Sequence, residues 1–169
     1  MFHYKGPMRS ALEIANWFIS ERDVTHLKLQ KLLYIAFGLH YVNQREALFY
    51  DQFEAWKYGP VLQNIYLHLK RHGRNRLTET IKVFDAVPMV SDVKAIETLQ
   101  LTWEHFGSKT ASELVAWTHA DGGPWDVAFD GREEQNLRPI GAAEIAKWFA
   151  VYWKDLQPTP KSLRKTARE

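Results

Sequence analysis

The sequence predicts a single, mainly α-helical domain of about six helices with one or two short strands or extended segments. Three observations predict this class. Apolar side chains recur at helical spacing along most of the chain. Helix-start signals precede several of these runs. The length of 169 residues suits one domain that buries a substantial core.

Two helices are expected in the first third of the chain. Ser10 and Glu13 form a capping-box pattern, which predicts a first helix near residues 10–20. Thr25 is a suitable N-cap for a longer second helix. That helix begins with polar residues, but it is apolar on nearly every side from Leu32 to Val42. A helix that is apolar all round is a buried one, so we expect it at the centre of the fold.

The middle of the chain mixes extended and helical signals. A short strand is expected near Phe53–Trp56, where aromatic residues alternate with other types. Pro60 fits the first position of a third helix, because that position needs no backbone N–H. Gly73 follows three basic residues and predicts the end of this helix. The β-branched residues at 78–84 predict a further strand.

The second half is predicted to be helical. Ser91 or Asp92 caps a fourth helix, and the capping box of Thr110 and Glu113 opens a fifth. Trp125 lies just inside a short helical turn. A last helix carries Ile145, Trp148, Phe149 and Tyr152. The chain then divides into an N-terminal extension (1–9), a helical domain (10–157) and a basic tail with two prolines (158–169), which we expect to be flexible.

Composition excludes several classes of protein. The net charge of +2 is too balanced for a dedicated nucleic-acid binder. The absence of cysteine excludes thiolate catalysis, cysteine-ligated zinc and disulfides. The N-terminus lacks the apolar segment of a signal peptide, and the longest apolar stretch is too short to span a bilayer. We therefore expect a cytoplasmic protein with no membrane partner.

Motifs for catalysis or metal binding are weak. The stretch 107–110 lacks the glycines that a phosphate-binding loop needs. His68 and His72 share one helix face, but no glutamate follows His68 and two basic residues lie between them, so they are interpreted as helix-end charges. His119 is expected to pack on a neighbouring tryptophan rather than transfer protons, because no nucleophile motif accompanies it. We expect no enzymatic activity, cofactor or metal, with an enzyme centred on His119 as an alternative.

The densest group of aromatic and charged residues is the string Glu-Ala-Trp-Lys-Tyr-Gly-Pro-Val at 54–61. These residues can seal the core, because rings and aliphatic stems bury well. They can also form a rigid aromatic recognition surface. The two interpretations are compatible.

Five strings of residues carry a resemblance to a known family. They are, in order, Ala15-Asn16, Leu27-Lys28-Leu29-Gln30-Lys31-Leu32-Leu33-Tyr34, Glu54-Ala55-Trp56-Lys57-Tyr58-Gly59-Pro60-Val61, Thr118-His119 and Pro124-Trp125. Together they resemble the Panacea domain, also called the SocA-like or GepA-like family of antitoxins. The resemblance covers roughly residues 10–155. The sequence departs from the family at Trp17, where a smaller aromatic residue is common, and in the two glycines before Pro124.

The resemblance implies an antitoxin of a bacterial or phage-borne toxin–antitoxin system. Such a protein neutralises its cognate toxin, encoded by a neighbouring gene, by direct protein–protein binding. It implies no catalytic residues and does not identify the toxin, because the family is paired with toxins of many kinds. Delivery of the toxin to a protease, and a nucleic-acid-binding role suggested by the basic tail, are the alternatives. Self-association is left open.

The candidate site residues fall into two groups. We expect partner contact at Trp56, Lys57 and Tyr58, with Lys28 and Lys31 as a charged rim from the solvated start of the second helix. The family motif adds residues with a structural or binding role: Asn16, Gln30, Tyr34, Glu54, Gly59, Pro60, His119, Pro124 and Trp125.

Overall fold

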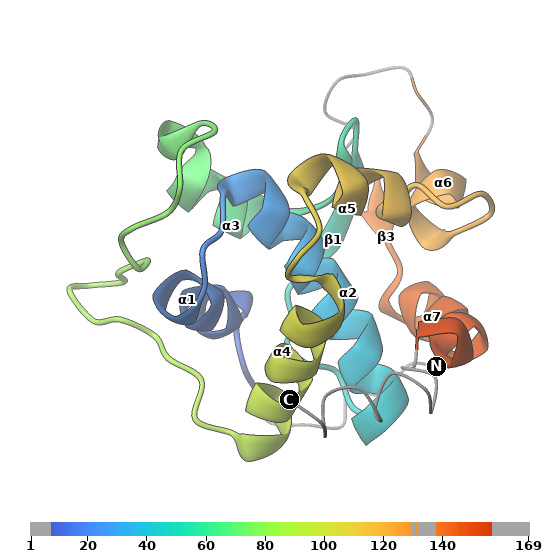
Figure 1. Ribbon diagram of the computed structural model, residues 1–169, viewed down its shortest axis with the longest axis horizontal. Helices are drawn as coiled ribbons and strands as arrows, with labels where there is room; N and C mark the ends of the chain where they lie inside the picture. Colours follow the sequence, from blue (N-terminus) through green and yellow to red (C-terminus); the bar gives the residue numbers. More distant parts are fainter. Residues whose placement is uncertain (1–7, 130, 132–137, 157–169) are drawn as a thin grey trace, which may run out of the picture.

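The computed structural model describes residues 8–129, 131 and 138–156. These residues form seven α-helices, one short 3-10 helix and three short strands (Figure 1), which confirms the mainly helical prediction. The elements are α1 (Ala11–Glu21), α2 (His26–Gln44), β1 (Phe53–Trp56), β2 (Gly59–Leu62), α3 (Gln63–Leu69), η1 (Lys70–His72), α4 (Val93–Phe106), α5 (Ala111–Thr118), α6 (Pro124–Ala128), β3 (Pro139–Ile140) and α7 (Ala142–Leu156).

Helix α2 is the central element, as the sequence predicts. It contacts α1, α3, α4, α5, α7 and β2, and Figure 1 shows it between α1 on one side and α7 on the other. Every residue from Leu29 to His40 is buried. Gly38 is the point of closest approach to α7, because an added Cβ there would lie 2.3 Å from a ring carbon of Phe149.

Aromatic rings fill the space between α2, β1 and α7. Tyr34 meets Phe53 at a centroid distance of 5.5 Å and Phe149 at 5.6 Å, both edge to face. Phe37 lies 5.2 Å from Phe49, so the aromatic contacts continue along α2. Edge-to-face pairs of this kind add stability beyond the area they bury. The high aromatic content therefore serves mainly the core.

The three strands form one antiparallel sheet in the order β2-β1-β3. The strand expected at Phe53–Trp56 is confirmed as β1. The prediction that Pro60 begins the third helix is wrong: Pro60 pairs with Ala55 inside β2, and α3 begins at Gln63. Strand β2 lies at the edge of the sheet. Proline is tolerated there, because a backbone N–H on the outer side of an edge strand has no neighbouring strand to donate to.

The local cap signals are confirmed. The capping boxes at Ser10–Glu13 and Thr110–Glu113 both form, and they open α1 and α5. Asp92 is the N-cap of α4, where its carboxylate accepts a hydrogen bond of 2.8 Å from the Ala95 amide. Thr25 caps α2. Helix α3 ends at Leu69, and a 3-10 turn carries the chain to Gly73, whose φ of +55° suits glycine.

The strand predicted at 78–84 is not formed. Residues in this segment instead hydrogen-bond to α1 through Asn16, which is itself fully buried. The Asn16 amide oxygen accepts from the Ile81 amide at 2.7 Å, and its Nδ2 donates to the carbonyls of Ile81 and Pro88, both at 2.9 Å. One side chain thus takes the place of a neighbouring strand and fixes the connection between η1 and α4.

Replacing Asn16 by alanine is expected to lower the free energy of unfolding by about 1–3 kcal/mol, because buried backbone groups lose their partners. Chemical denaturation measures this change, and hydrogen exchange should show faster exchange of the Ile81 amide. Ser20→Ala is the control on the same helix, because its hydroxyl bonds only within α1 at the Trp17 carbonyl. Unchanged protection of Ile81 in Asn16→Ala would contradict the role given to this side chain.

Two predicted regions lie at the ends of the chain. The basic tail at 158–169 and residues 1–7 of the predicted extension lie outside the described residues. Arg9, in contrast, is buried: its Nε donates to the Leu48 carbonyl at 2.8 Å, and its guanidinium approaches Glu46 at 3.7 Å and Asp92 at 3.6 Å. No helix in the described ranges is both long and apolar enough to cross a membrane.

Candidate functional site: the β1–β2 hairpin

The hairpin of β1 and β2 carries the residues that the sequence singles out. Its strands are joined by a two-residue turn, Lys57 and Tyr58. Both turn residues are exposed, and Tyr58 is 56% accessible. The Lys57 ammonium lies 5.4 Å from the centre of the Tyr58 ring, within cation–π range. The turn therefore presents an amphipathic tip to solvent.

A groove of about 240 Å³ lies beside this tip. Trp56, Tyr58, Val61 and Tyr66 contribute its apolar wall, and the rings of Trp56 and Tyr66 meet at 4.8 Å. Trp56 itself is only 7% exposed. It therefore seals the core and supplies part of the groove at the same time, which agrees with both interpretations of the 54–61 string. We call the exposed turn and this groove the hairpin surface.

Lys31 does not lie on the hairpin surface. The prediction that it belongs to a solvated helix start is wrong, because its side chain is fully buried. Its ammonium donates a 2.7 Å hydrogen bond to the Pro60 carbonyl, and so it attaches β2 to α2. Loss of hydration lowers the pKa of this lysine from 10.5 to about 7.

Lys28 is directed away from the hairpin surface, so the expected charged rim does not form. Its ammonium donates to the Gly107 carbonyl at 2.6 Å and lies 5.0 Å from the centre of the Trp103 ring. Burial lowers its pKa, while Asp23 and Glu113 oppose this shift. Lys28 thus connects α2 to the C-terminal end of α4.

Gly59 allows the hairpin to approach α2 closely. Its φ of +104° is one that other residues rarely adopt, and an added Cβ would lie 2.9 Å from both the Lys31 Cε and the Thr118 Oγ1. Glycine at this position therefore places the second strand directly over the buried lysine.

Gln30 fixes the other end of β2. Its amide oxygen accepts from the Leu62 amide at 2.9 Å, and its Nε2 donates to the Leu62 carbonyl at 3.2 Å. The side chain thus completes both backbone hydrogen bonds of a strand residue. Within β1, the Glu54 carboxylate accepts a 2.8 Å hydrogen bond from the Trp56 indole and so orients that side chain.

The segment from α5 to α6 also contacts the hairpin. The Trp125 indole donates to the Trp56 carbonyl at 2.7 Å, and the His119 ring stacks on Trp125 at 3.6 Å with an interplanar angle of 2°. Pro124 begins α6 and so positions Trp125. The predicted packing of His119 on a tryptophan is confirmed. Burial, with a smaller contribution from Lys31, lowers the pKa of His119.

The structure thus separates the candidate residues by role. Gln30, Lys31, Gly59, Pro60 and Trp125 hold the hairpin in place. Tyr34 lies in the aromatic core, where burial raises its pKa. Asn16 holds the 81–88 segment instead. Lys57 and Tyr58 are the members of the expected contact set that remain exposed.

Sequence reasoning missed His26 and Tyr66, which also line the groove. Their rings lie 5.5 Å apart, and burial lowers the pKa of His26 to about 4. No local signal brings them together, because they belong to different helices. Tyr66 could have been noticed as an aromatic residue beside the apolar stripe of α3.

Side chains that could bind a metal ion do not form a cluster among the described residues. Within residues 8–129, 131 and 138–156 no three histidine, aspartate or glutamate side chains lie close enough together to hold a metal ion. His68 is exposed, and His72 accepts a 3.3 Å hydrogen bond from the Arg71 Nε.

A known protein family matches this part of the chain. The model of the SocA-like antitoxin family, described as the Panacea domain, matches residues 29–126. The chain belongs to the Panacea family. The match includes α2 from Leu29 onward, the hairpin and the His119–Trp125 stack, so the residues that hold the hairpin lie inside the Panacea domain.

The chain is also similar to a curated protein. Antitoxin SocA of Caulobacter vibrioides is 36% identical over 118 residues, which are 64% of this chain and 61% of the length of that protein. No solved structure matches the chain.

Proposed function

We propose that this protein is an antitoxin that neutralises its cognate toxin by direct, stoichiometric binding through the hairpin surface. Membership of the Panacea family and the similarity to Antitoxin SocA support the antitoxin role. The toxin is the product of a neighbouring gene, and the complex forms in the cytoplasm without enzymatic turnover, cofactor or metal.

One observation supports the choice of this surface: the turn is exposed, whereas the residues that hold the hairpin in place are buried. Lys57 and Tyr58 project from strands that Gln30 and Lys31 attach to α2. A turn that is held in one conformation before binding loses little conformational entropy on association. The tip is thus pre-organised in the way that effective contact residues require.

The groove gives this surface a second feature of a protein interface. Tyrosine and tryptophan are enriched among residues that dominate binding energy, and an apolar pocket beside them can accept a side chain of the partner. At about 240 Å³ the groove has room for one large apolar side chain and is small for a metabolite.

Lys57→Glu is expected to weaken toxin binding at least about tenfold, because a negative side chain replaces the positive one that the proposed contact uses. The free energy of unfolding should stay within about 0.5 kcal/mol of wild type, as is usual at exposed positions. Titration calorimetry with the co-expressed neighbouring gene product and thermal melting measure the two quantities.

The control for this variant is Lys94→Glu, which makes the same charge change at an exposed position on α4. It should leave toxin binding unchanged. Tyr58→Ala should weaken binding without a change of charge. If Lys57→Glu and Tyr58→Ala both bind the toxin with wild-type affinity, the hairpin surface is not the contact.

Direct neutralisation is separable from delivery to a protease. In a purified system without protease, one equivalent of this protein should abolish toxin activity. Inhibition that appears only after addition of a protease would favour the adaptor mechanism. A DNA-binding role would appear as affinity that falls steeply with salt.

A further inference from the structure

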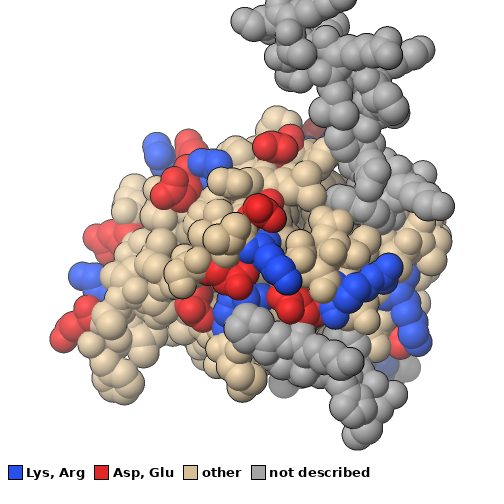
Figure 2. All heavy atoms as spheres, turned by 90° about the horizontal axis from the view of Figure 1, so that it is seen from below, with Lys and Arg blue, Asp and Glu red and all other residues tan. Residues whose placement is uncertain are grey.

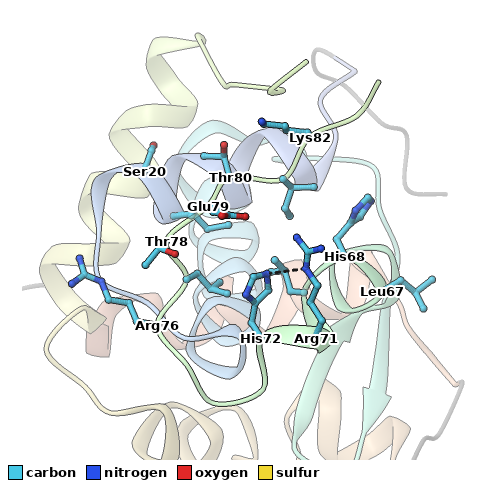
Figure 3. Close-up of a pocket in the computed structure, with 14 residues that line it drawn as sticks. Ser20, Leu67, His68, Arg71, His72, Arg76, Thr78, Glu79, Thr80 and Lys82 are labelled. Carbon is cyan, nitrogen blue, oxygen red and sulfur yellow. Dashed lines mark hydrogen bonds between the residues drawn. The ribbon is translucent and has the colours of Figure 1, made fainter. Parts of the chain in front are cut away.

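A second hollow, larger than the groove, lies beside η1. Its volume is about 1030 Å³, and its walls are the end of α1, the helices α3 and η1, and the segment Arg76–Lys82 (Figure 3). Side chains with charges or hydroxyl groups contribute most of the labelled lining. We call it the cationic cavity.

The cationic cavity holds an excess of positive charge that its own residues do not neutralise. Arg71 and Lys82 line it, and neither forms an ion pair within the described ranges. The Arg71 Nε donates to His72, which leaves the terminal nitrogens of the guanidinium available. Arg76 also lines the cavity, but its Nε pairs with Asp23 at 3.0 Å. The acid in the lining is Glu79.

We infer that the cationic cavity binds a carboxylate-rich segment of the protein partner. An arginine with free terminal nitrogens binds a carboxylate through two parallel hydrogen bonds. Lys82 supplies a second positive group, and the hydroxyls of Thr78 and Thr80 add donors along the same wall (Figure 3). This inference rests on the proposed function in so far as the partner is the toxin.

The position of the cavity favours a partner that also covers the hairpin surface. His72 lines the cationic cavity, and the next residue, Gly73, lines the groove beside the hairpin. Adjacent residues at the end of η1 thus line the two hollows. A protein lying over η1 can place an apolar side chain in the groove and acidic side chains in the cavity.

The distribution of charge over the molecule favours a protein partner over a nucleic acid. On another face of the molecule, acidic and basic side chains are intermingled (Figure 2), whereas a nucleic-acid binder concentrates basic residues along a stripe. The net charge of +2 agrees with this pattern.

The test begins with a probe that does not depend on the toxin. A fluorescently labelled hexaglutamate peptide is titrated with the full-length protein at low salt, and binding is followed by anisotropy and by amide chemical shifts. We expect saturable binding with shifts at residues 76–82 and η1. Arg71→Glu and Lys82→Glu should each weaken it at least about tenfold. Glu79→Gln should strengthen it.

Arg74→Glu is the matched control, because Arg74 is exposed and does not line the cavity. It should change the affinity less than about twofold, as expected from net charge alone. Absence of saturable hexaglutamate binding would overturn the inference. So would equal losses in Arg71→Glu and Arg74→Glu, or tighter binding of a single-stranded hexanucleotide that Arg71→Glu abolishes.

Binding of the toxin then separates this inference from the proposed function. If the cavity binds the partner, Arg71→Glu weakens the complex, while Lys57→Glu leaves hexaglutamate binding unchanged. Loss of toxin binding in Lys57→Glu but not in Arg71→Glu or Lys82→Glu would overturn the role of the cavity and leave the hairpin surface intact. The reverse result would overturn the hairpin surface alone.

Discussion

Phe149→Ala is expected to lower the free energy of unfolding by about 3–5 kcal/mol, the range for removal of a fully buried phenylalanine. The Phe149 ring lies 5.6 Å from Tyr34 and 5.7 Å from Trp117, so its loss leaves a void where α2, α5 and α7 meet. Urea-induced unfolding followed by tryptophan fluorescence measures the change.

Gly38 supplies the control for this prediction. Gly38→Ala should cost about 1–3 kcal/mol on its own, because its new methyl group would overlap the Phe149 ring. In the Phe149→Ala protein that methyl group enters vacant space. The double variant should therefore be more stable than the sum of the single effects predicts, by more than about 0.5 kcal/mol. Strictly additive effects would show that α7 does not pack on α2 at Gly38.

The free energy of unfolding is expected to rise as the pH increases from about 7 toward 10, because of Lys31. Burial lowers the pKa of this lysine to about 7 from an ordinary value of 10.5. Between these values the unfolded chain binds a proton that the folded protein does not, so raising the pH favours folding. The slope has an upper limit of about 1.4 kcal/mol per pH unit.

Lys31→Met should remove most of this rise, since methionine keeps a similar length and carries no charge. Lys57→Met is the control, because Lys57 is exposed and its loss should leave the rise in place. Denaturation between pH 7 and 9.5 compares the three proteins. Higher pH is avoided, because the raised pKa of Tyr34 reverses the sign there: the folded state keeps a proton that the unfolded state loses. Identical slopes in wild type and Lys31→Met would contradict the burial of Lys31.

Local signals in the sequence predicted the helices well. The capping boxes that open α1 and α5 depend on residues three positions apart, and so they are visible in the sequence. The burial of α2 followed from its all-round apolar pattern. Pro60 was misassigned because the rule for helix starts is local, whereas pairing with Ala55 decides the structure.

The candidate site was predicted only in part, because its geometry depends on distant contacts. The exposure of Lys57 and Tyr58 agrees with a recognition surface, but Lys31 was placed in solvent because lysine is rarely buried. Its acceptor, the Pro60 carbonyl, is 29 residues away. The cationic cavity could not be predicted either, since the Asn16 bonds to the 81–88 segment fix one of its walls.

The central position of α2 has a consequence for synthesis of the protein. Helix α2 is complete at Gln44, whereas α7, which covers one side of it, begins only at Ala142. During translation, α2 is therefore complete but lacks part of its cover while residues 45–141 are being added. Such surfaces promote aggregation and attract chaperones and proteases. A ribosome that stops before α7 would release a chain that cannot complete its core, so the supply of active protein depends on synthesis through the last helix.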